Sequence, residues 1–185
     1  MPMLENIGFR VLSEHSYEVG GDSTSFIHDF SIERDGGYSL PKERLKPLIE
    51  ELFRRSWVGD CEDDGFNELV LTAGMSWDAI AIIRASGKYL RQLGMGYTPD
   101  YIADGMVKNA EISAQLFALF KARLDPSYSK KNREELTANI IADLGALMEN
   151  VSSLDHDRIL RAYQNVIEST LRTNVYQDGV IEGVD

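Results

Sequence analysis

The chain has 185 residues, a formal net charge of −11 and an apolar fraction of 43%, so it can build a sizeable core in one domain or in a small module joined to a larger one. The acidic charge excludes a nucleic-acid-binding surface, because neutralising phosphates requires clustered lysine and arginine. A single cysteine, Cys61, excludes an internal disulfide and fits a reducing compartment. With no bilayer-spanning run and no signal-peptide pattern, the sequence predicts a cytoplasmic protein without a membrane partner.

The first part of the chain has the pattern of a β-hairpin. Residues 4–8 resemble a last helical turn with its glycine cap, and alternating apolar residues predict half-buried strands at 9–19 and 24–33 around a turn at 20–23. Pairing across that turn predicts one apolar face from these opposed residues: Val19 and Thr24, Tyr17 and Phe26, His15 and His28, Val11 and Ile32.

A helix at about 41–56 follows a loop at 35–37, and Pro47 predicts either a late start near Lys46 or a kink. Helix end, strand, strand and helix make up most of a ferredoxin-like unit that lacks its first strand. We therefore expect an α+β fold that is mainly α. A partial ACT-like (ferredoxin-like) module would occupy 1–60, an all-helical connector domain 61–176, and a flexible tail 177–185.

Helical spacing dominates the second part. The predicted helices are 66–73, 77–93, 99–108, 110–124, 130–150 and one from the serines at 152–153 through Leu171. Ser76, Thr98 and Asn109 are the expected N-caps. The last two helices are expected to form an antiparallel hairpin.

The helix at 77–93 is expected to be central, because its apolar residues nearly encircle the axis. Arg84, Lys88 and Arg91 recur at helical spacing and form a basic ridge. Two interpretations apply to this ridge. In the first, the three charges pair with acidic side chains of neighbouring helices or face water, and the acidic composition of the chain favours this interpretation. In the second, the ridge is a docking or anion-binding strip.

No catalytic signature is present: the sequence has no G-x-G-x-x-G, P-loop, H-E-x-x-H or paired cysteines. His15 and His28 could be cross-strand neighbours with Asp29 adjacent, but partly buried imidazoles are favoured over a metal site, since converging ligands are lacking. Trp57 and Trp77 are expected to pack in the core or between helices. No catalytic, cofactor-binding or metal-binding residue is assigned.

Several long strings of the chain resemble the large bacterial NAD-specific glutamate dehydrogenases. In chain order they are FIHDF (26–30), FNELVLTAGMSW (66–77), IRASGKYLRQLG (83–94), ALFKARLDP (118–126), DRILR (157–161) and TLRTN (170–174). Together they run along nearly the whole chain, and only the tail after Gln177 shows no match.

The resemblance implies a position between ACT-like modules and the catalytic portion of such an enzyme. The parent reaction would oxidise L-glutamate to 2-oxoglutarate with NAD, and the parent would be a homo-oligomer. Three hypotheses follow: a non-catalytic regulatory or connector segment that contacts the catalytic and other N-terminal domains of the same polypeptide, an amino-acid-sensing ACT-like module, and a stand-alone helical adaptor. The extent of the resemblance favours the first.

Overall fold

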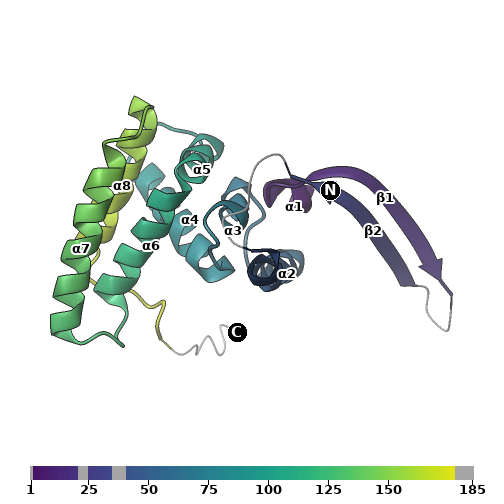
Figure 1. Cartoon of the computed structure of the whole chain (residues 1–185), viewed down its shortest axis with the longest axis horizontal. Coiled ribbons are helices and arrows are strands. Elements are labelled where there is room, and N and C mark those ends of the chain that lie inside the picture. Colours follow the sequence, from purple (N-terminus) through teal and green to yellow (C-terminus); the bar gives the residue numbers. More distant parts are fainter. Residues whose placement is uncertain (1, 21–24, 35–40, 178–185) are drawn as a thin grey trace.

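The computed structural model describes residues 2–20, 25–34 and 41–177, and it shows a two-stranded arm attached to a body of helices (Figure 1). In chain order the elements are α1 (Pro2–Asn6), β1 (Arg10–Val19), β2 (Ser25–Glu33), α2 (Lys42–Val58), the 3₁₀ helix η1 (Gly65–Glu68), α3 (Leu69–Thr72), α4 (Trp77–Gln92), α5 (Pro99–Lys108), α6 (Ala110–Leu124), α7 (Lys130–Met148) and α8 (Leu154–Ser169). The expected α+β, mainly α fold is confirmed. The predicted turn at 20–23, the loop at 35–37 and the tail after Gln177 lie largely outside the described residues.

The register of the hairpin differs from the expected one because of a β-bulge. Val11 lies opposite Ile32 as predicted, but the register shifts by one residue between Val11 and Ser13. Tyr17 therefore lies opposite Ile27 instead of Phe26. A one-residue shift reverses which side chains share a face, so the apolar residues are divided between the two faces of the hairpin.

The same shift separates the two histidines. His15 lies opposite Asp29, and His28 lies opposite Ser16. Both imidazoles are exposed, and His28 Nδ1 is 2.8 Å from Glu14 Oε1. The expectation of two neighbouring, partly buried histidines is therefore wrong.

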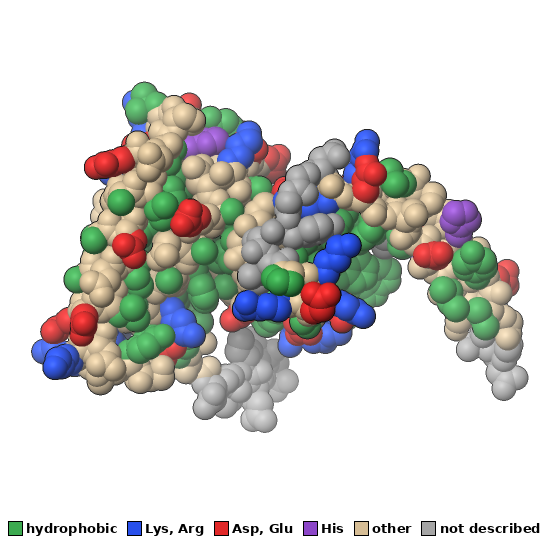
Figure 2. All heavy atoms as spheres, viewed as in Figure 1, with side chains coloured by type: hydrophobic (Ala, Val, Ile, Leu, Met, Phe, Trp, Pro, Cys, Tyr) green, Lys and Arg blue, Asp and Glu red, His purple; other side chains and the backbone are tan. Residues whose placement is uncertain are grey.

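The arm extends away from the helices, so the expected half-burial of its strands is also wrong. Large apolar side chains on it are exposed, with Phe26 at 61%, Ile27 at 56% and Tyr17 at 54%. Figure 2 shows hydrophobic side chains along this arm. An isolated two-stranded hairpin is only marginally stable in water, and most of the apolar side chains of this one stay exposed.

The helical body surrounds α4, which contacts α2, α3, η1, α5, α6 and α8. Ile80 and Ile83 of α4 are fully buried, and each contributes roughly 2–3 kcal/mol of hydrophobic stabilisation. The helix is not enclosed on every side, however, because Tyr89 and Leu93 are 50% and 63% exposed. The central position of α4 is as expected, and the exposed side chains of Tyr89 and Leu93 mark the side that no described helix covers.

Several helix ends follow the sequence signals. The Thr98 hydroxyl accepts a hydrogen bond from the backbone amide of Tyr101 at 3.2 Å, and the Ser153 hydroxyl accepts one from the backbone amide of His156 at 3.3 Å. Gly94 adopts a positive φ of 93° after α4, a conformation that side chains disfavour. Ser76 is the N-cap residue of α4 as predicted, but its side chain makes no capping hydrogen bond.

The helix α2 begins at Lys42 and runs through Pro47, so of the two alternatives for Pro47 the late start near Lys46 is wrong. Trp57 is 63% exposed and stacks on Phe53 of the same helix at 6.1 Å, so its expected packing in the core or between helices is also wrong. The helix α7 packs mainly against α6, while α8 packs against α4, α5 and α6. The predicted hairpin of the last two helices is therefore replaced by an α6–α7 hairpin, with α8 inserted into the body.

Candidate functional site

The first candidate feature is the basic ridge of α4, where Arg84 is only 4% exposed. Its guanidinium donates from Nε to Asp64 Oδ2 at 2.8 Å, and from Nη2 to Asp64 Oδ1 at 2.9 Å and Asn67 Oδ1 at 2.7 Å. The planar fork of arginine suits this two-oxygen contact. Arg84 therefore fixes the 59–68 segment, including η1, onto α4.

The other two ridge residues lie nearer to solvent. Lys88 pairs with Glu62, also from the 59–68 segment, whereas Arg91 is exposed and makes no ion pair with any residue that the structure describes. Arg84 and Lys88 thus follow the pairing interpretation. Docking or anion binding by the ridge of Arg84, Lys88 and Arg91 stays a prediction, in which Arg91 is the accessible charge.

The second feature is a set of contacts that clamps α8, beginning at its N-terminal end. Tyr97 donates from its hydroxyl to Asp155 Oδ1 at 2.7 Å, and this hydrogen bond together with burial raises the pKa of Tyr97. The His156 ring packs on Tyr101 at 5.5 Å and against Gly105, where an added Cβ would come within 3.3 Å of the imidazole. The start of α8 is therefore held by α5 and the loop before it.

The C-terminal end of α8 is held from α6. Arg123 donates from Nε to the Ile167 carbonyl at 3.3 Å and from Nη2 to the Glu168 carbonyl at 2.5 Å. The last carbonyls of a helix lack partners within the helix and carry partial negative charge. Arg123 thus supplies a cap from another helix and fixes where α8 ends.

The middle of α8 is buried against α4. Tyr163 is fully buried, and the hydroxyl end of its side chain lies against Gly87 of α4, which the Phe66 ring also contacts. Burial raises the pKa of Tyr163, because the ionised phenolate would be desolvated. Its hydroxyl has no hydrogen-bond partner among the residues that the structure describes.

These clamp contacts position a helix and contain no nucleophile–base pair. Within residues 2–20, 25–34 and 41–177, no cluster of three or more His, Cys, Asp and Glu side chains could hold a metal ion. Cys61 is partly buried, with its Sγ 3.2 Å from Ser56 Oγ. The sequence analysis did not single out Tyr97, Arg123 or Tyr163, because their partners lie on helices distant in the chain.

Three protein-family models match successive stretches of the chain. Residues 1–45 match the glutamate dehydrogenase ACT3 domain, residues 61–126 match glutamate dehydrogenase helical motif 3, and residues 143–183 match the catalytic domain of bacterial NAD-glutamate dehydrogenase. The chain belongs to the bacterial NAD-specific glutamate dehydrogenase family. The last match includes α8 and extends past Gln177, where the sequence analysis recognised no resemblance.

Curated relatives agree with this assignment. The chain is 37% identical to the NAD-specific glutamate dehydrogenase of Halomonas elongata over 180 residues, 35% to that of Pseudomonas aeruginosa over 181 residues, and 33% to that of Mycobacterium tuberculosis over 192 residues. Each alignment includes 95–96% of this chain but only 11% of the relative. The chain therefore spans about a tenth of the length of these enzymes.

The clamp connects the stretch that matches helical motif 3 to the stretch that matches the catalytic domain. The residues that hold α8 (Tyr97, Tyr101, Gly105 and Arg123) lie in the stretch that matches helical motif 3, whereas α8 itself lies in the stretch that matches the catalytic domain. None of the described helices is long and apolar enough to cross a membrane.

Proposed function

We propose that this chain is a non-catalytic regulatory or connector segment of an NAD-dependent glutamate dehydrogenase, whose whole reaction converts L-glutamate and NAD to 2-oxoglutarate, ammonia and NADH. The observation that supports the proposal is the clamp on α8. A helix matching the catalytic domain is held at both ends and in the middle by residues matching the helical motif.

The clamp suits a mechanical role because its contacts fix α8 in translation and in rotation. A charge-assisted cap such as that of Arg123 contributes about 1–3 kcal/mol. The fit of Tyr163 over Gly87 resists sliding of the two helices, since packed interiors have few voids. Displacement of the helical body would therefore displace α8 and whatever is attached to it.

At the other end of the segment, residues 1–60 would form part of an ACT-like module that contacts the other N-terminal domains of the same polypeptide. A cavity of about 520 Å³ between the arm and α2 is lined by Leu4, Phe9, Ile32, Leu45 and Ile49, among others. A neighbouring domain that covers this open apolar surface would complete the module. The proposal includes a cytoplasmic homo-oligomer as the parent enzyme, with NAD bound outside this chain.

The same cavity supports a second candidate function, amino-acid sensing by the ACT-like module. Its rim carries charges of both signs, Lys42 and Lys46 beside Glu43 and Glu50, which could face the two charged groups of a free amino acid. A stand-alone helical adaptor is disfavoured by the similarity to dehydrogenases over 95–96% of the chain.

Two measurements on the purified chain test the proposal. Absorbance of NADH at saturating L-glutamate and NAD should show no turnover, and steady turnover would refute a non-catalytic role. Isothermal calorimetry with glutamate and aspartate should show no saturable heat. Saturable binding that is lost in a Lys46→Glu variant but kept in an Arg91→Glu variant would favour the sensing function instead.

A further inference from the structure

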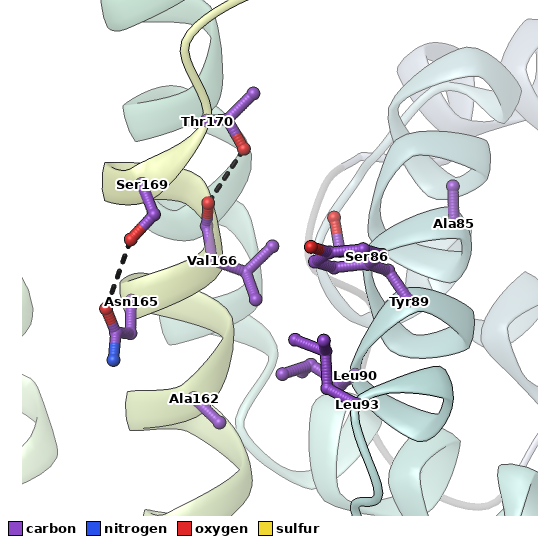
Figure 3. Close-up of a pocket in the computed structure, with 10 residues that line it drawn as sticks. All are labelled: Ala85, Ser86, Tyr89, Leu90, Leu93, Ala162, Asn165, Val166, Ser169 and Thr170. Carbon is purple, nitrogen blue, oxygen red and sulfur yellow. Dashed lines mark hydrogen bonds between the residues drawn. The ribbon is translucent and has the colours of Figure 1, made fainter.

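A groove lies between α4 and α8, and the residues that line it are not those of the clamp contacts. Its volume is about 530 Å³, and it is lined by Tyr89 and Leu90 from α4, by Leu93 directly after α4, and by Ala162 and Val166 from α8, among others. Figure 3 shows the apolar side chains of α4 facing those of α8 across this groove. Tyr89 and Leu93 remain 50% and 63% exposed, so none of the described residues covers it.

Three hydroxyl groups of the groove already donate hydrogen bonds to groups four residues earlier in the chain. Ser86 donates from its hydroxyl to the Ile82 carbonyl at 2.9 Å, and Thr170 donates to the Val166 carbonyl at 2.7 Å. Ser169 donates to the Asn165 side chain at 3.3 Å (Figure 3). The groove therefore offers mainly hydrocarbon to an incoming group, and a charged or strongly polar ligand would lose hydration there without replacement.

The shape of the groove suits a helix. Its walls are two helices in contact, and the small residues Ala85, Ser86 and Ala162 would allow the backbone of a third helix to come close. The flanking side chains Tyr89 and Leu93 lie one helical turn apart and would form a ridge against that helix. An amphipathic helix laid into such a groove buries its apolar face.

We propose that this groove binds the apolar face of a helix from the remainder of the catalytic domain of the same polypeptide. This inference rests on the proposed function. One wall, α8, lies in the 143–183 stretch that matches the catalytic domain, and that stretch is too short for a dinucleotide-binding fold, which needs two βαβαβ halves. The relatives extend far beyond this chain, which covers 11% of each. A covalently linked helix beside α8 would have a high effective concentration at the groove.

The test uses a cysteine at the groove, in a Cys61→Ser background. The chain is prepared alone and also grafted into the Halomonas elongata enzyme in place of the 180 residues that it matches. A maleimide labels Leu93→Cys or the control Gln92→Cys, at an exposed neighbouring position, and peptide mass spectrometry gives each labelling rate. We expect both thiols to react readily in the isolated chain, and Leu93→Cys to react at least about tenfold more slowly in the graft, because docking removes it from solvent.

Equal rates at Leu93→Cys in the two proteins would overturn the proposal. Slow labelling of Leu93→Cys in the isolated chain, becoming slower as the protein concentration rises, would also overturn the proposal. A second copy of the chain would then occupy the groove. A second variant tests the same contact through the activity of the graft. Leu93→Glu should lower the activity of the graft at least about tenfold relative to Gln92→Glu. The melting temperature of the isolated chain should not change with Leu93→Glu, which shows that the variant folds. Failure of the proposed function would appear separately, as glutamate oxidation by the isolated chain.

Discussion

Gly87 of α4 and Tyr163 of α8 fit against each other so closely that a Cβ on the glycine would overlap the tyrosine hydroxyl. This contact brings the two helices together at the middle of the clamp. Glycine inside a helix normally costs roughly 1 kcal/mol relative to alanine. Here the cost is offset because the absent side chain leaves room for a fully buried aromatic ring.

Gly87→Ala should therefore destabilise the protein, although alanine favours the helix. Overpacking of this kind costs about 1–3 kcal/mol, measurable as a lower midpoint in urea unfolding. Gly145→Ala in α7 is the matched control, because an added Cβ there meets nothing within 4 Å. It should raise stability by up to roughly 1 kcal/mol. If both substitutions stabilise, the helices are not in contact at Gly87.

Tyr163→Phe tests the buried hydroxyl. Because that hydroxyl has no partner among the described residues, its removal should leave stability at pH 7 equal or raise it by about 1 kcal/mol. The raised pKa of Tyr163 keeps the folded phenol neutral. Above about pH 10 only the unfolded tyrosine ionises, so wild-type stability falls as pH rises.

The stability difference between Tyr163→Phe and wild type should consequently widen from pH 9 to pH 11, as followed by urea unfolding at each pH. Tyr97→Phe is a useful comparison, since it removes a hydroxyl that does have a partner, Asp155, and should destabilise at pH 7. A marked loss of stability in Tyr163→Phe at pH 7 would show that its hydroxyl is hydrogen-bonded.

Arg123→Met should loosen the end of α8 while keeping the apolar stem of the side chain. The lost bonds to the Ile167 and Glu168 carbonyls should lower stability by about 1–2 kcal/mol. Amide hydrogen exchange should become faster in the last turn of α8. Lys121→Met, at an exposed position two residues earlier, should change neither quantity; equal effects of the two variants would exclude a capping role.

The exposed arm should cause self-association of the isolated chain, because unpaired strand edges with apolar side chains are templates for pairing. Phe26→Lys combined with Ile27→Lys should shift the mass measured by light scattering toward the monomer. Leu154→Lys replaces a residue that is 66% exposed on the helical body and should not. A strictly monomeric wild-type chain at high concentration would contradict this prediction.

Ile83→Asp should unfold the helical body, since Ile83 is fully buried in α4 and an unpaired buried charge costs several kcal/mol. Circular dichroism should show a large loss of helix at 25 °C. The control Ala85→Asp lies at an exposed position of the same helix and should retain the fold. An unchanged melting temperature in Ile83→Asp would mean that α4 is peripheral.

Sequence reasoning located most helices because their ends carry local signals. Thr98 and Ser153 are caps that act within three residues, and Gly94 adopts the backbone conformation that ends α4. Asn109 shows the limit of such signals. It is the N-cap residue of α6 as predicted, but its side-chain amide donates to the Gly105 carbonyl at 2.8 Å and so caps the end of α5 instead of the start of α6.

Tertiary relationships were less predictable. The bulge between Val11 and Ser13 reverses the apolar pattern of the arm, and no glycine or proline marks it in the sequence. The spacing of Arg84, Lys88 and Arg91 identifies the basic ridge, but it does not decide between ion pairing and docking. The burial of Arg84 against Asp64, 20 residues earlier, depends on how η1 folds back onto α4.

Hydrogen exchange of the isolated chain tests the central claim most directly, namely that α8 is an integral part of the helical body. If so, the core amides of α8 around Tyr163 should exchange with the same free energy of opening as those of α4 around Ile83, through one cooperative unfolding. Opening of α8 at a free energy well below that of α4 would contradict the claim, because α8 would then be free to move without the body that holds it.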